Sequence, residues 1–166
     1  MSTELIFQTT STSSDDTLRL GELLGSKLSG GEVIDLVADL GGGKTTLTQG
    51  LARGLGSQEN VVSPTFTLNR IYKGRSGLEL HHFDFYRLNE PGIIADQLAE
   101  SANDKKVVTV VEWSDIVKDV LPIEHITIEF RMAPDDPDER QITITYSENF
   151  ANIIKDLEDV WAGSRP

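Results

Sequence analysis

Residues 38–46 carry the most informative chemistry of this chain. A glycine-rich turn runs into Lys44 and Thr45, with an apolar run before it and a helical pattern after it. Glycines allow successive backbone N–H groups to surround an anion, and the N-terminus of the following helix adds positive potential. The pattern is typical of a phosphate-binding loop, in which the lysine reaches the terminal phosphates and the threonine hydroxyl binds Mg²⁺. The loop backbone expected to cradle the phosphates is that of Leu40, Gly41, Gly42 and Gly43.

One position of this loop departs from the usual pattern, which has a glycine five residues before Gly43. Here that position is Ala38. The alternative interpretation is a strand–turn–helix corner that carries Gly-Lys-Thr by chance. The strand-like and helix-like flanks favour the phosphate loop, and the alanine puts in question only how tight the first turn of the loop is.

A phosphate-binding loop needs an acidic partner for Mg²⁺, and Glu112 stands where one is expected. It directly follows the apolar run Val107–Val111, and the first acid of such sites normally sits at the end of a buried strand. A glutamate is longer than the usual aspartate, so it requires a deeper metal or an intervening water. The alternative is a strand end that faces solvent.

A second acid, Asp84, lies near the end of another strand-like segment. Ligands of open α/β sheets bind at the carboxyl edge of the strands, so Asp84 could hold a metal-bound water or orient the attacking water. Alternatively it forms a structural pair with Arg87. We interpret the nearby His82 as a core or hydrogen-bonded histidine rather than a catalytic one.

The elements that must position these residues alternate between strand-like and helix-like patterns, which favours a layered α/β fold. We expect a single domain over residues 1–166, with a mixed, mainly parallel sheet between two helix layers. A β-hairpin insertion is predicted over residues 66–85. The predicted strands cover residues 5–7, 33–37, 66–72, 78–85, 107–111, 125–132 and 141–146. One predicted helix begins after Ser13, and three others cover residues 45–55, 91–102 and 149–161. The last helix is expected to pack through Ile153, Ile154, Leu157, Val160 and Trp161.

The composition limits the partners that this chain can bind directly. It has 27 Asp and Glu against 15 Lys and Arg, a formal net charge of −12, so its surface repels phosphate backbones and anionic membranes. It has no cysteine, which excludes a disulfide, a thiolate metal site and a cysteine nucleophile. With neither a signal-peptide pattern nor an apolar run long enough to span a bilayer, we expect a cytoplasmic protein that contacts RNA only through a partner.

Two classes of phosphate-loop protein are disfavoured by missing features. Guanine-specific GTPases usually carry Asn-Lys-x-Asp, and the nearest string here, residues 103–106, does not match. Small-molecule kinases clamp two phosphate groups with several lid arginines, and this chain has few candidates. An ATPase site is therefore favoured.

Four motifs in this order resemble the TsaE (YjeE) family of small bacterial ATPases in the tRNA threonylcarbamoyladenosine pathway. They are 38–46, Val62–Thr67, His82–Leu88 and Val111–Trp113. The resemblance covers roughly residues 5–145 and implies a P-loop NTPase-like fold. It also implies dependence on ATP and Mg²⁺, with TsaB and TsaD as partners, in modifying adenosine 37 of tRNAs that read ANN codons.

The resemblance also implies roles for individual residues. Lys44 becomes the phosphate lysine, Thr45 and Glu112 the Mg²⁺ ligands, and Asp84 a residue that orients water or lies beside the metal. Thr46 contacts the α-phosphate, Ser63 and Thr65 belong to a switch-like loop near the γ-phosphate, and Trp113 lines the nucleotide site, a partner surface or the core. Ser114 and Asp115 depart from the family's usual continuation.

Three functional hypotheses follow. The leading one is an ATPase that turns over slowly until a partner completes the site, because no arginine finger is evident. The second is an interaction module in which ATP binding, rather than hydrolysis, sets the shape of residues 61–67. The third, a small-molecule phosphotransferase, is weakened by the shortage of clamp arginines.

Overall fold

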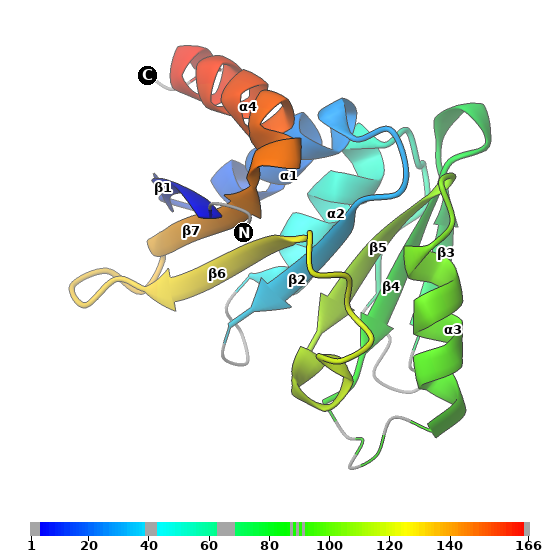
Figure 1. Cartoon of the computed structure of the whole chain (residues 1–166). Coiled ribbons are helices and arrows are strands. Elements are labelled where there is room, and N and C mark those ends of the chain that lie inside the picture. Colours follow the sequence, from blue (N-terminus) through cyan, green and yellow to red (C-terminus); the bar gives the residue numbers. More distant parts are fainter. Residues whose placement is uncertain are drawn as a thin grey trace.

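Seven strands form one mixed sheet with helices on both faces (Figure 1). The computed structural model describes residues 4–38, 43–62, 69–86, 88, 90 and 92–164. The strands are β1 (Glu4–Ser11), β2 (Val33–Val37), β3 (Asn69–Lys73), β4 (Glu79–Asp84), β5 (Val107–Glu112), β6 (Ile126–Met132) and β7 (Arg140–Ser147). The helices are α1 (Ser14–Lys27), α2 (Lys44–Gly54), α3 (Gly92–Ala102) and α4 (Ala151–Ser164), with short 3₁₀ turns η1 (Arg75–Gly77), η2 (Ser114–Val117) and η3 (Glu148–Phe150).

The strand order is β1-β7-β6-β2-β5-β4-β3. The four central strands, β6, β2, β5 and β4, pair in parallel, whereas β1–β7, β7–β6 and β4–β3 pair antiparallel. The expected mixed sheet and β3–β4 hairpin are therefore confirmed. The four central strands are parallel, as expected, and the antiparallel pairs lie at the two ends of the sheet.

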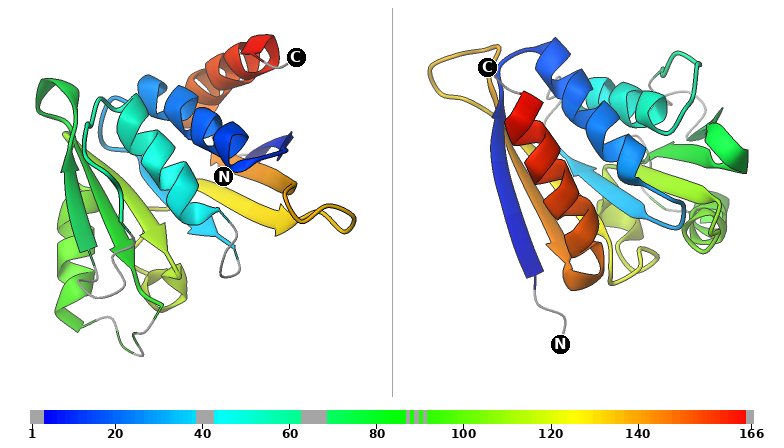
Figure 2. Two further views of the ribbon diagram at one scale, coloured as in Figure 1. Left: turned by 180° about the vertical axis from the view of Figure 1, so that it is seen from behind. Right: turned by 90° about the horizontal axis from the view of Figure 1, so that it is seen from above.

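The two faces of the sheet carry separate hydrophobic cores. Helices α1, α2 and α4 cover one face, and α3 covers the opposite face of β4 and β5 (Figure 2). On β5, Val108 and Val110 belong to the first core and Val111 to the second. All of β5 is buried, which confirms the prediction from its unbroken apolar run.

Helices α1 and α2 pack at backbone contact through two pairs of glycines. A Cβ on Gly50 would lie 2.3 Å from the carbonyl oxygen of Leu18 and 2.8 Å from the Cα of Gly21. Gly25 and Gly54 are equally close to the facing backbone. This close contact sets the position of α2, whose first residue is Lys44.

The local signals at the ends of elements are mostly confirmed. The Ser13 hydroxyl caps α1 by accepting the N–H of Asp16 at 3.0 Å. The helix ends at Lys27, before Gly30 and Gly31, which adopt positive φ in the turn to β2. In α4, Val160 is 39% exposed, so its predicted packing role is wrong.

Asp35 is one of several buried carboxyls in the described residues. Asp35 on β2 is 4% exposed, and its Oδ1 has no hydrogen-bond partner within the described part of the chain. Burial raises the pKa of Asp35, although the Ser114 hydroxyl, His125 and Lys118 oppose the rise. No described helix is both long and apolar enough to cross a bilayer.

Candidate functional site

The carboxyl ends of three parallel strands meet at the start of α2. In the sheet register Leu36 of β2 is opposite Glu112 of β5, and Glu112 is opposite Asp84 of β4. The two acids therefore lie side by side, as the rule for open α/β sheets predicts. Gly43 precedes α2 with φ 103°, a left-handed conformation that suits glycine.

The Lys44 ammonium makes three contacts with described residues. Its Nζ donates to the carbonyl oxygen of Ala38 at 3.2 Å and lies 3.5 Å from Oε1 of Glu112. The same ammonium sits 4.5 Å from the centre of the Trp113 ring, a cation–π distance. At 6% exposure the lysine is already desolvated, so its charge acts strongly on nearby anions.

Glu112 is held on both of its carboxylate oxygens. Oε2 accepts a hydrogen bond from Nε2 of His82, and Oε1 faces Lys44. Burial on its own would raise the pKa of Glu112, but the His82 hydrogen bond and the Lys44 charge outweigh it and lower the pKa. The carboxylate therefore stays ionised at neutral pH.

Asp84 is a different kind of acid. It is 7% exposed, and its Oδ1 accepts the backbone N–H of Tyr86 at 2.9 Å. Burial raises the pKa of Asp84, and the neighbouring charge of Glu112 adds to the rise. Two adjacent carboxyls with opposite pKa shifts are typical of a site that divides acid and base roles. Arg87, its alternative structural partner, lies outside the described residues.

Trp113 follows Glu112 in a strained conformation. Its φ of 57° and ψ of 53° are left-handed, which costs about 1–2 kcal/mol in a non-glycine residue. The ring packs against Tyr86, with centroids 4.9 Å apart, and lies against the Lys44 ammonium. Strain of this kind concentrates at functional sites, so Trp113 belongs to the site as well as to the packing around it.

The remaining predicted residues divide into those that the structure describes and those that it does not. Thr45 is exposed and Thr46 half-buried, both in the first turn of α2. Ala38 has no positive φ, and its side chain packs against the main core, so alanine is compatible with this backbone. Leu40, Gly41, Gly42, Ser63 and Thr65 lie outside the described residues.

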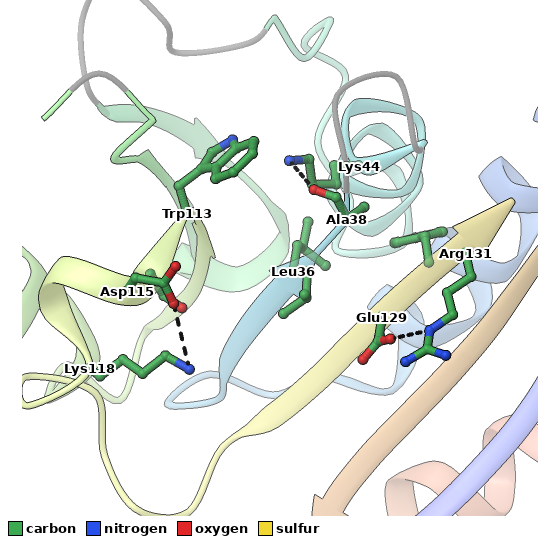
Figure 3. Close-up of a pocket in the computed structure, with 11 residues that line it drawn as sticks. Leu36, Ala38, Lys44, Trp113, Asp115, Lys118, Glu129 and Arg131 are labelled. Atoms are coloured by element: carbon green, nitrogen blue, oxygen red, sulfur yellow. Dashed lines mark hydrogen bonds and ion pairs between the residues drawn. The ribbon is translucent and has the colours of Figure 1, made fainter.

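A pocket of about 320 Å³ opens beside Lys44 (Figure 3). Lys44, Ala38 and Trp113 line one end of it. The other walls come from η2 with the following residue and from the end of β6, and they carry the ion pairs Asp115–Lys118 and Glu129–Arg131. In the sequence, Ser114 and Asp115 stand out only as departures from the family pattern. Sequence reasoning missed the β6 wall, because that segment carries no motif and only the strand order brings β6 beside β2.

The oxygen donors near Lys44 suit a hard cation that arrives with phosphate. Thr45 follows Lys44 in the first turn of α2, Glu112 faces the lysine, and Asp84 is opposite Glu112 in the sheet register. Among the described residues no group of three or more His, Asp or Glu could hold a metal ion unaided. Mg²⁺ usually binds one or two protein carboxylates together with substrate phosphates and water, so this donor set fits Mg²⁺ carried by a nucleotide.

Fold and site together define a mixed α/β protein with a buried lysine and two acids at the carboxyl edge of its parallel strands. Comparisons with known proteins are consistent with one another. The family model "Threonylcarbamoyl adenosine biosynthesis protein TsaE" matches residues 11–142. The chain therefore belongs to the TsaE family, which functions in tRNA threonylcarbamoyladenosine biosynthesis.

Individual relatives agree with this family. A TsaE of Treponema pallidum is 41% identical over 134 residues, 81% of this chain and 96% of the relative. A TsaE of Bacillus subtilis is 37% identical over 131 residues, 79% of this chain and 80% of the relative. The crystal structure of Bacillus subtilis YdiB superimposes with a TM-score of 0.71 at 30% identity and covers 96% of this chain and 97% of that one.

Proposed function

We propose that this chain is a P-loop ATPase of the TsaE family that binds Mg–ATP and hydrolyses it slowly to ADP and phosphate. The observation that carries the proposal is the convergence of Lys44, Glu112 and Asp84 where three parallel strands meet the start of α2. A desolvated cation beside an ionised carboxylate, at a helix N-terminus, matches the charge pattern of nucleotide phosphates with Mg²⁺.

Each residue of this group has a role that its surroundings support. Lys44 would exchange its contacts with Ala38 and Glu112 for phosphate oxygens, neutralising charge that develops on the γ-phosphate. Glu112 and the Thr45 hydroxyl would hold Mg²⁺, which supplies further positive charge to the phosphates. Asp84, next to Glu112, would orient the attacking water in line with the bond that breaks.

The biological setting of the reaction is also proposed. The chain would act in the cytoplasm with TsaB and TsaD during threonylcarbamoyl modification of adenosine 37 in tRNA. The net charge of −12 supports an indirect contact with tRNA through these partners. Because no arginine finger is evident from the sequence, we expect a partner to accelerate turnover.

The test is ATP hydrolysis by the full chain, alone and with TsaB and TsaD. Lys44→Ala and Glu112→Ala should each lower turnover by about 10²-fold or more, as for groups that stabilise transition-state charge. Matched controls are Lys155→Ala, on the exposed side of α4, and Glu79→Gln, at the opposite edge of the sheet. Equally fast hydrolysis with and without partners would refute partner dependence, and unchanged hydrolysis in Lys44→Ala would refute the site.

A second function, an interaction module controlled by nucleotide binding, is favoured by the anchoring of Val61 and Val62. The Gln49 side chain of α2 accepts the N–H of Val61 at 2.8 Å. The Tyr72 hydroxyl accepts the N–H of Val62 at 3.0 Å and donates to its carbonyl oxygen at 3.1 Å. Movement of α2 on nucleotide binding would therefore reach residues 61–62. If Glu112→Ala abolishes hydrolysis but supports normal tRNA modification, binding rather than hydrolysis is the essential step.

A further inference from the structure

His82 has contacts that packing alone does not explain. The side chain is fully buried on β4, two residues before Asp84, with Val110 of β5 opposite it. Its Nε2 bonds Oε2 of Glu112, and because an ionised carboxylate only accepts, Nε2 carries the hydrogen. Its Nδ1 has no hydrogen-bond partner within the described ranges.

An unpartnered ring nitrogen in a core is unfavourable. Burying a polar atom without a hydrogen bond costs free energy that a leucine at the same place would avoid. The face of the sheet that His82 shares with Leu80 and Val110 is apolar, and both of these neighbours are fully buried. In the described structure the ring donates its hydrogen bond to Glu112. Holding that carboxylate therefore explains why a polar ring occupies this apolar position.

The two oxygens of Glu112 are held unequally. Oε2 has a close hydrogen bond to a ring that is fixed in the core. Oε1 lies 3.5 Å from Nζ of Lys44, beyond good hydrogen-bond length, and that ammonium is shared with Ala38 and the Trp113 ring. The His82 contact is therefore the permanent one and the Lys44 contact the exchangeable one.

We propose that His82 is a positioning residue that holds Oε2 of Glu112, so that Oε1 stays directed at the Mg–nucleotide when Lys44 leaves it for the phosphates. The inference rests on the proposed function and adds the residue that orients the metal ligand. Partners that orient metal ligands typically contribute about 10–100-fold to metal affinity or activity. Loss of His82 should therefore weaken the response to Mg²⁺ and leave nucleotide binding by Lys44 in place.

The experiment uses Trp113 as the reporter in a Trp161→Phe background. Trp161 lies far from the site, donating to Thr9 between α4 and β1, so the remaining tryptophan signal comes from the ring beneath the Lys44 ammonium. Titration with ATP, with and without Mg²⁺, reports the departure of Lys44 and the tightening of binding by Mg²⁺. Turnover with TsaB and TsaD is measured on the same proteins.

The variants separate the hydrogen bond from the packing. His82→Leu removes the hydrogen-bond donor, and His82→Asn shortens its reach. Without Mg²⁺, we expect both variants to bind ATP within about 3-fold of the parent. The increase in ATP affinity on adding Mg²⁺, and kcat, should each fall by about 10-fold or more. His82→Gln keeps a long donor and should recover both to within about 3-fold. His81→Leu is the matched control, because that half-buried histidine is on the opposite face of β4 and pairs with Glu79.

Two results would overturn the inference. The first is a His82→Leu variant whose ATP affinity still rises with Mg²⁺ as much as that of the parent. If the leucine variant does not unfold cooperatively, and so is not properly folded, the same result in His82→Asn counts instead. The second is a glutamine variant that folds but loses as much as the leucine variant. If the parent binds no Mg–ATP, both the proposed function and this inference are overturned. If Mg²⁺ raises the ATP affinity of the parent and of the His82 variants equally, only this inference is overturned.

Discussion

Replacing Gly50 by alanine tests whether the contact between α1 and α2 sets the position of the site. The added Cβ would lie 2.3 Å from the carbonyl oxygen of Leu18 and 2.8 Å from the Cα of Gly21. Both neighbours are backbone atoms, so the helices must move apart. Overpacking typically costs about 1–3 kcal/mol, and a clash with backbone belongs at or above the upper end of that range. Alanine has a higher helix propensity than glycine, which offsets this loss by about 1 kcal/mol. The free energy of unfolding should therefore fall by a net amount of about 2 kcal/mol.

The assay is urea unfolding followed by circular dichroism, with thermal unfolding alongside. For a chain of this length about 2 kcal/mol corresponds to a fall in Tm of about 4–8 °C. Gly163→Ala is the matched control, because its Cβ would meet nothing within 4 Å; that change should be neutral or stabilising by less than about 1 kcal/mol. Since α2 begins at Lys44, Gly50→Ala should also weaken ADP binding. A Gly50→Ala protein as stable as the parent would refute the reasoning.

Three further predictions concern buried polar groups. Lys44→Met should destabilise the protein by about 1–3 kcal/mol, because it leaves Oε1 of Glu112 without its cation. A double-mutant cycle with Glu112→Gln, measured by urea unfolding, should give a coupling energy of about 0.5–3 kcal/mol. Because the folded-state pKa of Glu112 is lowered, its contribution to stability is present above its ordinary pKa and is lost as the pH falls through the lowered value. Burial raises the folded-state pKa of Asp35, so its charged form destabilises the fold at neutral pH. Asp35→Asn should therefore stabilise the protein at neutral pH. In urea titrations this gain should shrink as the pH falls through the raised pKa and be absent below the ordinary value of 3.8. Tyr72→Phe should cost about 1–3 kcal/mol and speed limited proteolysis near Val62, because it removes two hydrogen bonds to that residue.

Each of these predictions has a control or an outcome that contradicts it. Additive losses in the double-mutant cycle would show that Lys44 and Glu112 do not interact. A stability gain for Asp35→Asn that persists unchanged in acid would exclude ionisation as its cause. Tyr86→Phe, at a 45% exposed tyrosine, should leave the proteolysis pattern unaltered, and the same pattern in both tyrosine variants would refute the anchoring role.

Much of the fold could be predicted because its signals are local. The apolar run 107–111 predicted a buried strand, and the structure has β5 over Val107–Glu112 with every residue buried. The strand expected over 33–37 and the cap at Ser13 also agree with the structure. The order of the strands could not be predicted, because it depends on contacts between segments far apart in the chain, such as β1 with β7.

The candidate site could be predicted in part. Lys44, Glu112 and Asp84 were expected at strand ends or in the loop, and the structure brings them together. His82 is buried and hydrogen-bonded, as interpreted from the sequence, but a single histidine in an apolar stretch gives no indication that its partner is Glu112. The glycine pairs of α1 and α2 were missed as well, since four-residue glycine spacing within each helix has meaning only once the helices face each other.

The sequence shows which kinds of groups are available: a lysine and a threonine after a glycine-rich turn, two acids after strand-like segments, and a strongly acidic composition. These follow from residue type and short-range spacing, which backbone geometry converts directly into turns, helices and strands. Three features of the site are visible only in the folded chain. Asp84 and Leu36 are both opposite Glu112 in the sheet register. His82 and Lys44 contact different oxygens of Glu112. Trp113 adopts a left-handed backbone, with its ring under the Lys44 ammonium. Such contacts depend on strand order and on backbone approach between distant segments, which are set by the packing of the whole core.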